Sequence, residues 1–126
     1  MKYILWKNFI MCCLGVLSAW NPVAASGSSN WVEVVSSAPF AARKDHSSVI
    51  YEGRIYVIGG DNEYSYFNDV WSSGDGGATW TEVTASAGWN IRGYHGSVVY
   101  ESNIVVMGGF NGSSYLNDVW SSGDGG

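Results

Sequence analysis

Short runs of apolar and β-branched residues alternate with polar, glycine-rich gaps along most of this chain. One stretch contains four such runs, at His46–Tyr51, Arg54–Ile58, Asn68–Ser72 and Thr79–Val83. Runs of about 4–8 residues bounded by Gly, Asn, Asp and Ser are typical of β-strands and the turns between them. No segment after the first 30 residues has the length and period of a helix, so the pattern predicts an all-β fold built from four-stranded units.

The same pattern occurs twice along the chain. Asp69–Gly77 recurs letter for letter as Asp118–Gly126, a shift of 49 residues (118 minus 69). With that shift Trp31 falls on Trp80, no gap is needed, and more than half of the paired positions are identical. A period of roughly 50 residues, filled with short strands and glycine turns, is typical of a β-propeller.

Three landmarks recur in order within each period: a glycine pair after the second strand, a tryptophan on the third strand, and a tryptophan opening the fourth. They are Gly59-Gly60 and Gly108-Gly109, Trp71 and Trp120, and Trp31 and Trp80. In these landmarks the chain resembles the kelch family, whose blades belong to the galactose-oxidase-like propeller superfamily. The resemblance implies a partial β-propeller of two kelch-type four-stranded blades, with repeat 1 at residues 31–79 and repeat 2 at residues 80–126. It also implies that the tryptophans pack between neighbouring blades.

The turn between the third and fourth strands carries a second resemblance. Ser73–Trp80 reads Ser-Gly-Asp-Gly-Gly-Ala-Thr-Trp, which is similar to the Asp-box of sialidase-like propellers. We expect the Asp75 carboxylate to accept backbone N–H groups across a tight hairpin, while Gly76 and Gly77 supply positive φ angles. In those families the box is structural, so the motif predicts a stable turn rather than an activity.

The first 25 residues have the layout of a secretory signal peptide. Lys2 and Lys7 precede the apolar run Phe9–Ala19, and Val23–Ala25 offers small residues for cleavage. We therefore expect a signal peptide at residues 1–25, a linker at residues 26–30, and a secreted, periplasmic or cell-surface protein without stable membrane insertion after cleavage. An uncleaved N-terminal anchor is the alternative.

Composition after cleavage narrows the classes of function. Cys12 and Cys13 would leave with the signal peptide, so the mature chain would have no disulfide and no thiolate for metal or nucleophilic chemistry. Loss of Lys2 and Lys7 leaves four of the six basic residues against eleven acidic ones, a net charge of −7 (4 minus 11). Because such a surface repels phosphate backbones, nucleic-acid binding is excluded.

The polar residues that could carry chemistry are mostly repeat equivalents of one another. His46 and His95 open the first strand of each period, Arg43 and Arg92 come just before it, and Asp69 and Asp118 precede a Val-Trp pair. We interpret the histidines as structural, the arginines as bridges between blades, and the aspartates as turn or edge residues. The sequence therefore predicts no catalytic, metal or cofactor site.

Aromatic residues in two connections differ between the copies and are the candidate ligand-binding residues. They are Phe40, Tyr64, Trp89 and Phe110. In kelch propellers these connections emerge on one face, so we expect a shared exposed surface that binds a protein or a glycan outside the cytoplasm. The alternative is that these aromatics fold back to cover the blade junction.

Several further expectations concern the whole protein. The leading interpretation is a non-catalytic binding module. The alternatives are a structural propeller that spaces other domains, or the N-terminal fragment of a carbohydrate-active or galactose-oxidase-like enzyme whose catalytic residues lie beyond residue 126. Asn111-Gly-Ser113 is a glycosylation sequon in a eukaryotic secretory host.

Two blades are fewer than the roughly 4–8 of closed propellers, so we expect a truncated chain or one that self-associates through its unpaired blades. In the second case Trp31–Val35 could complete a blade of a neighbouring copy by strand exchange.

Overall fold

The computed structural model describes residues 30–126. The chain divides into two units, Met1–Trp31 and Val32–Gly126, and the fold discussed below is that of the second unit. The expected signal peptide at residues 1–25 lies outside the described residues, as does most of the expected linker at residues 26–30.

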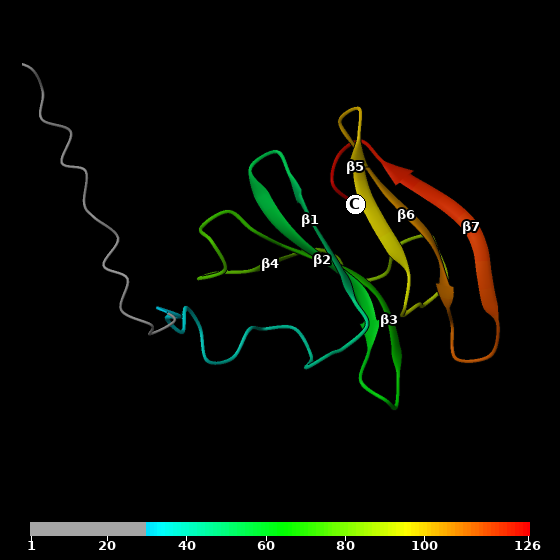
Figure 1. The fold of residues 1–126 in the computed structure, drawn as a ribbon, viewed down its shortest axis with the longest axis horizontal. Helices are drawn as coiled ribbons and strands as arrows, with labels where there is room; N and C mark the ends of the chain where they lie inside the picture. The colour runs from blue at the N-terminus through cyan, green and yellow to red at the C-terminus, as the bar shows by residue number, and fades with distance from the viewer. Residues whose placement is uncertain (1–29) are drawn as a thin grey trace, which may run out of the picture. The chain divides into compact units, whose positions relative to one another are not determined.

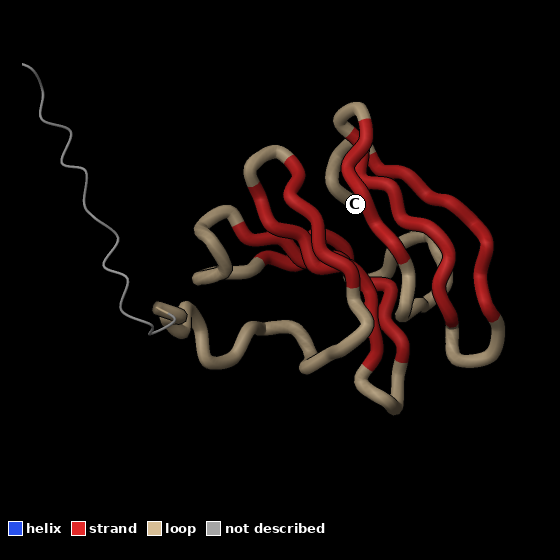
Figure 2. Tube along the Cα trace, in the orientation of Figure 1, coloured by secondary structure: helices blue, strands red, loops and turns tan. Residues whose placement is uncertain are grey.

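Two antiparallel β-sheets make up the second unit (Figures 1 and 2). The first sheet has the order β1-β2-β3-β4 and the second the order β5-β6-β7. The strands are β1 (Ser47–Tyr51), β2 (Arg54–Asp61), β3 (Tyr66–Ser73), β4 (Thr81–Thr84), β5 (Gly96–Tyr100), β6 (Asn103–Phe110) and β7 (Tyr115–Ser122). Residues 30–126 form no helix, and the expected all-β architecture of partial propeller blades is confirmed.

The sheets differ from the expected blades in where the fourth strand comes from. The first sheet takes β4 from the second repeat, because β4 pairs with β3 through the tight turn at residues 74–80. Val32–Val35, the equivalent segment of the first repeat, forms no strand, and the second sheet has three strands within the described residues. The two sheets of four and three strands are those of a partial kelch-type propeller.

The hydrophobic core lies between the two sheets. Ile58 and Val70 of the first sheet pack with Ile104 and Val106 of the second, and all four side chains are buried. The Tyr51 hydroxyl joins the sheets at one end, since its single O–H lies within hydrogen-bonding distance of the carbonyl oxygens of Ser102 (3.1 Å) and Gly123 (2.8 Å). The two blades thus bury one face each against the other, which is the packing expected of neighbouring propeller blades.

The glycine pair near the end of β2 allows the next connection to approach the strand closely. Gly59 and Gly60 have φ angles of 54° and 99°, and the pairing of β2 with β3 shifts register at this point. A Cβ atom on Gly60 would lie 2.6 Å from the backbone oxygen of Lys44. Glycine is needed here because the backbone angle and the close contact both exclude a side chain.

No helix within residues 30–126 is long and apolar enough to cross a membrane.

Candidate functional site

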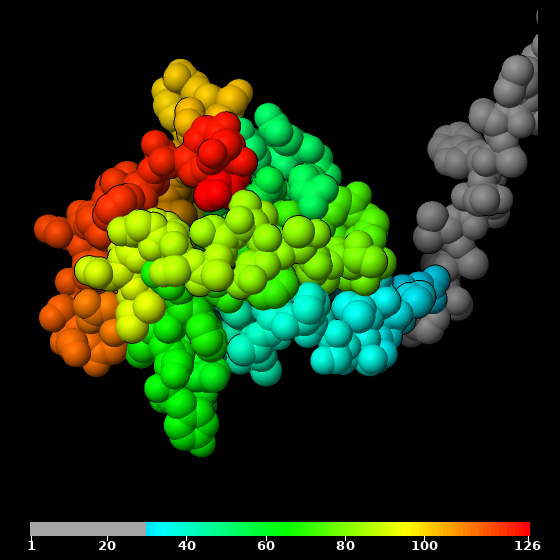
Figure 3. Space-filling view, turned by 180° about the vertical axis from the view of Figure 1, so that it is seen from behind, coloured from blue at the N-terminus to red at the C-terminus, as the bar shows by residue number. Residues whose placement is uncertain are grey.

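Both repeats place two connections at the same end of their sheets. The connection before β1 is tied to the end of β2 by a bridge between Lys44 and Asp61, and the connection before β5 is tied to the end of β6 by a bridge between Gly93 and Phe110. The loops after β2 and β6 turn at this same end, where the β2–β3 loop projects from the molecule (Figures 1 and 3). We call the end formed by residues 62–66 and 110–115 the loop face.

Side-chain hydrogen bonds hold both loops of the loop face in shape. Asn62 Oδ1 accepts the backbone N–H groups of Tyr64 (3.2 Å) and Ser65 (2.8 Å). Asn111 Oδ1 does the same for Ser113 (2.9 Å) and Ser114 (2.8 Å). Because asparagine replaces a backbone acceptor in such turns, the loops are ordered before any partner arrives.

Three aromatic rings form a row across the loop face. The ring of Phe110 lies 5.8 Å from that of Tyr66 on the neighbouring blade and 5.1 Å from that of Tyr115. Gly112 lies over the Tyr66 ring, where a Cβ atom would be 3.1 Å from two of its carbons. We call Tyr66, Phe110 and Tyr115 the aromatic row. Tyr115 is 89% exposed, so the row ends in solvent.

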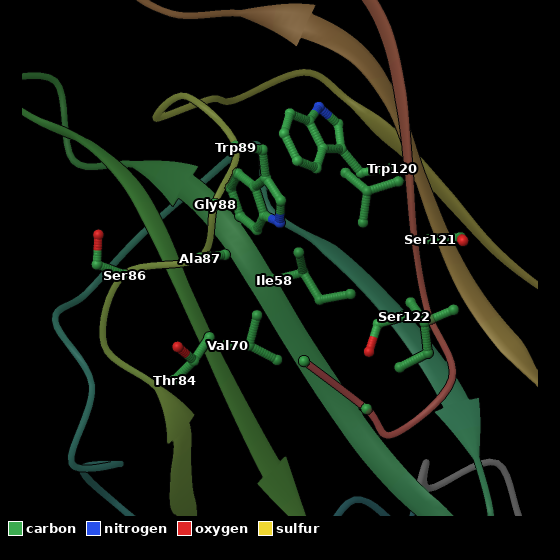
Figure 4. Close-up of a pocket in the computed structure, with 14 residues that line it drawn as sticks. Ile58, Val70, Thr84, Ser86, Ala87, Gly88, Trp89, Trp120, Ser121 and Ser122 are labelled. Carbon is green, nitrogen blue, oxygen red and sulfur yellow. The ribbon is translucent and has the colours of Figure 1, made fainter.

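The four candidate ligand-binding residues do not share one exposed surface. Tyr64 is 91% exposed at the tip of its loop, and Phe110 is half-buried in the aromatic row. Trp89 is only 8% exposed and belongs to the core between the sheets (Figure 4), so the expectation of an exposed Trp89 is wrong. Phe40 is half-buried against Trp71 and lies off the loop face. For these two residues the structure has the alternative arrangement, in which the ring covers the blade.

Two residues of the loop face were missed from the sequence. Tyr66 and Tyr115 are repeat equivalents, whereas all the predicted surface residues stand at positions where the two copies differ. Their position in the sequence could have indicated exposure, since each is the first residue of a strand and directly follows a loop that begins with asparagine. Identity between repeats therefore did not mean burial.

Buried arginine–aspartate pairs hold the connections before β1 and β5. The Arg43 guanidinium donates to both oxygens of Asp69, at 2.6 and 2.9 Å, and to the Gly59 carbonyl at 2.9 Å. It also lies over the Phe67 ring, 4.5 Å from the centroid. The Arg43 side chain is 2% exposed, and its guanidinium lowers the pKa of Asp69, as does the Trp71 N–H.

The second repeat has the same arrangement. Arg92 donates to both oxygens of Asp118 at 2.8 Å and to the Gly108 carbonyl. Each pair thus lies within one blade and links its entry connection to its third strand. The arginine side chains therefore do not bridge blades, although the backbone of Arg92 does, through hydrogen bonds with Gly60 and Phe67 of the first blade. Asp69 lies within β3, and Asp118 lies on β7, an edge strand of its sheet in residues 30–126. Each arginine lies 26 residues before its aspartate in the sequence, and the antiparallel strands between them bring the two side chains together.

The comparisons with known proteins agree with this geometry. The family model described as the KLHDC2/KLHL20/DRC7 Kelch-repeats domain matches residues 21–122. The chain belongs to the kelch-repeat family. A search of curated proteins finds no match.

Among solved structures, the chain is similar to the one described as "Structure of YjhT". The two share 27% sequence identity and superpose with a TM-score of 0.51. The similarity covers 58% of this chain but only 22% of that one, so the kelch-repeat chain spans about a fifth of the length of its structural relative.

Kelch-repeat domains are typically non-catalytic binding modules, and the described residues offer little to hold a metal ion. No three His, Cys, Asp or Glu side chains of residues 30–126 gather into a metal-binding group. The loop face of this kelch-repeat chain is instead aromatic and hydrogen-bonded, an arrangement that suits contact with another molecule.

The histidines of the kelch repeats lie near the blade junction. His95 is 8% exposed, and its Nε2 lies 2.7 Å from the hydroxyl oxygen of Ser47 on the first blade. Its Nδ1 has no hydrogen-bond partner among residues 30–126. Burial, together with the Arg92 guanidinium and His46 nearby, lowers the pKa of His95 to about 4. His95 is therefore neutral at pH 7 and joins the blades through Ser47.

The hairpin between β3 and β4 is closed by side chains. Asp75 accepts the backbone N–H of Thr79 at 2.9 Å and its hydroxyl at 2.6 Å, and the Ser73 hydroxyl donates to it at 2.8 Å. Gly76 and Gly77 have φ angles of 74° and 100°. The hydrogen bonds from Thr79 and Ser73 lower the pKa of Asp75 to about 2, so its carboxylate is charged at pH 7.

Replacing Asp75 with alanine should open this hairpin locally. The Thr79 amide would lose its acceptor, so its hydrogen exchange, measured by NMR, should become markedly faster than in the unchanged chain. Asp75→Asn is the matched control, since the amide oxygen can still accept the Thr79 N–H and should preserve most of the protection. Equal exchange in the Ala and unchanged chains would show that the carboxylate does not hold the turn.

Proposed function

We propose that this kelch-repeat chain is a non-catalytic module of an exported protein, and that its loop face binds a protein partner. The observation that carries the proposal is the aromatic row, which runs from one blade to the next and ends in the exposed ring of Tyr115. Exposed tyrosines on ordered loops contribute large contact area at low entropic cost, and tyrosine is enriched among residues that dominate binding energy.

Exposed charges beside the aromatic residues of the loop face support a protein partner. Next to Tyr64, the Lys44 ammonium lies 3.5 Å from the Glu63 carboxylate, and both side chains are at least half exposed. A rim of exposed charges around aromatic rings is the usual composition of a transient protein interface. Export rests on the signal-peptide pattern of residues 1–25.

A peptide-display selection tests the proposed binding surface. Random peptides would be selected for binding to the purified chain and then measured against single substitutions. Tyr115→Ala and Tyr64→Ala should each weaken the selected peptides about tenfold or more, because they remove exposed aromatic contacts from the loop face. The control is Tyr100→Ala, whose ring is also exposed but lies at the far end of β5.

Two outcomes would change the proposal. If a glycan array gives binders that depend on Tyr115 whereas the peptide selection gives none, the loop face binds carbohydrate, for which stacking on tyrosine is equally suitable. If Tyr100→Ala weakens binding as much as Tyr115→Ala does, the loop face is not the binding surface.

A further inference from the structure

One loop of the loop face contains an asparagine that is followed directly by glycine. Asn111-Gly112, in the loop between β6 and β7, is the sole Asn-Gly pair in the sequence. In such a pair the backbone nitrogen of the glycine can attack the side-chain carbonyl carbon of the asparagine, because the two groups are neighbours and no side chain on the glycine hinders the approach. The attack begins a deamidation, which converts the side-chain amide into a carboxylate. Its rate depends on the hydrogen bonds that the loop imposes on both groups.

The loop holds the Asn111 amide in a form that favours attack. Asn111 Oδ1 accepts the backbone N–H groups of Ser113 at 2.9 Å and of Ser114 at 2.8 Å. Two backbone donors on one carbonyl oxygen stabilise the negative charge that develops there when a nucleophile adds to the carbon. The turn that orders this loop therefore also activates its first residue.

The attacking nitrogen of the pair is free. The Gly112 N–H donates no hydrogen bond within residues 30–126, and Gly112 is exposed, so water can take its proton. Phe110, two residues earlier, has no side-chain oxygen that could accept this N–H. Nothing in this part of the chain therefore has to be broken before the nitrogen reacts.

The equivalent loop of the first repeat has the same activated amide but a blocked nitrogen. Asn62 Oδ1 accepts the N–H groups of Tyr64 at 3.2 Å and of Ser65 at 2.8 Å, and both asparagines are half-buried. The next residue is Glu63, whose side chain hinders attack and whose N–H donates to Asp61 Oδ1 at 3.0 Å. Asp61 is only 3% exposed, so this acceptor is held in place. The two repeats thus differ in the nucleophile alone.

We propose that Asn111 is a site of self-catalysed deamidation, at which the loop face gains a negative charge. The Gly112 nitrogen loses its proton to water and bonds to Asn111 Cγ, while the Ser113 and Ser114 N–H groups hold the oxyanion on Oδ1. The bond from Cγ to Nδ2 then breaks, and Nδ2 takes up a proton and leaves as ammonia. The product is a cyclic imide. Water adds to either imide carbonyl and breaks its bond to nitrogen, which gives aspartate or isoaspartate at position 111.

Both products alter the loop face. Each places a carboxylate next to Phe110, whose ring lies 5.1 Å from that of Tyr115. Isoaspartate also adds a carbon atom to the backbone, which displaces Gly112 from its position over the Tyr66 ring. The inference stands whether or not the loop face binds a protein.

Peptide mapping by mass spectrometry tests the proposal on the full chain, produced in bacteria so that Asn111 carries no glycan. During incubation at neutral pH, Asn111 should deamidate at least about tenfold faster than Asn62, because in the first loop the hydrogen bond from Glu63 to the Asp61 carboxylate must break first. Isoaspartate methyltransferase should label position 111 as the reaction proceeds, because the imide opens in both directions.

Two variants of the first loop separate the effect of glycine from that of the free N–H. Glu63→Gly creates a second Asn-Gly pair, and glycine fits the φ angle of 75° at this position. Its N–H still donates to Asp61, so Asn62 should remain slower than Asn111. Adding Asp61→Ala removes the acceptor and should bring Asn62 to the rate of Asn111. Glu52→Gly is the matched control, since Glu52 also has a positive φ angle, of 47°, but lies in the turn between β1 and β2, and it should change neither rate.

Three results would overturn the inference. The first is an Asn111 that keeps its amide throughout prolonged incubation, and the second is an equal rate at Asn62 and Asn111 in the unchanged chain. The third is a Glu63→Gly chain in which Asn62 already reacts as fast as Asn111, since the free N–H would then have no effect. None of these measurements involves a bound peptide, so this inference and the proposed function fail separately.

Discussion

Replacing Arg43 with alanine should lower the free energy of unfolding by about 3–5 kcal/mol. The substitution leaves the Asp69 carboxylate, whose side chain is only 15% exposed, without its bidentate partner. It also removes the donor to the Gly59 carbonyl and the cation over the Phe67 ring. Urea denaturation followed by tryptophan fluorescence measures the change.

The neighbouring residue provides the control for this prediction. Lys44 pairs with Glu63 at 3.5 Å, but both side chains are largely in water, so Lys44→Ala should cost less than about 1 kcal/mol. Arg43→Lys should fall between the two, since an ammonium keeps the charge but cannot bond both carboxylate oxygens in a fork. If Arg43→Ala costs no more than Lys44→Ala, the buried pair does not hold the connection before β1.

Acidification from pH 7 to pH 4 should remove about 3 kcal/mol of stability through His95 alone. The ordinary pKa of histidine is 6.5, whereas burial lowers the pKa of His95 to about 4 in the folded chain. Between these values the unfolded chain binds a proton and the folded chain does not, so unfolding is favoured as the pH falls. The contribution of His95 is fully present above pH 6.5 and is lost progressively as the pH approaches 4.

The contribution of His95 to stability is lost in a different pH range from the contributions of the aspartates. The hydrogen-bonded aspartates, whose pKa values are lowered from 3.8, lose their contribution only as the pH falls below about 4. Denaturation of His95→Gln should therefore lose most of the slope between pH 7 and pH 4.5 but keep a smaller part from His46, whose pKa is also lowered by burial. His46→Gln should keep most of the slope because His46 is more exposed. An unchanged slope in His95→Gln would assign the pH dependence to other groups.

Local features of the fold followed well from residue patterns. The turn residues Gly76 and Gly77 have the positive φ angles that the sequence predicts, and the glycine pair Gly59-Gly60 lies near the end of the second strand as expected. The strands lie where the sequence predicted them, but β2 and β3 are longer than expected. β2 continues through the glycine pair to Asp61, and β3 begins at Tyr66, directly after the β2–β3 loop. Strand ends depend on pairing with a neighbour, which no local pattern specifies.

The candidate site was predicted only in part. The sequence indicated that two connections emerge at one end of the sheets and that Tyr64 is exposed, but it treated Phe40 and Trp89 as equal members of the surface. A ring in a connection can point to solvent or back onto its blade, and the choice depends on the space that the facing sheet leaves. Trp89 meets Ile58 and Val70 of the first blade, so it is buried.

By itself the sequence determined the kelch-type repeat, the order of strands within it and the tight turns, because strand alternation and glycine conformations are local properties that recur at a fixed interval. Tertiary structure alone decided which repeat supplies a fourth strand, which aromatic rings are exposed, and that Arg43 and Arg92 bind Asp69 and Asp118. These outcomes depend on contacts between residues distant in sequence, whose energies arise only when neighbouring strands and blades exclude water.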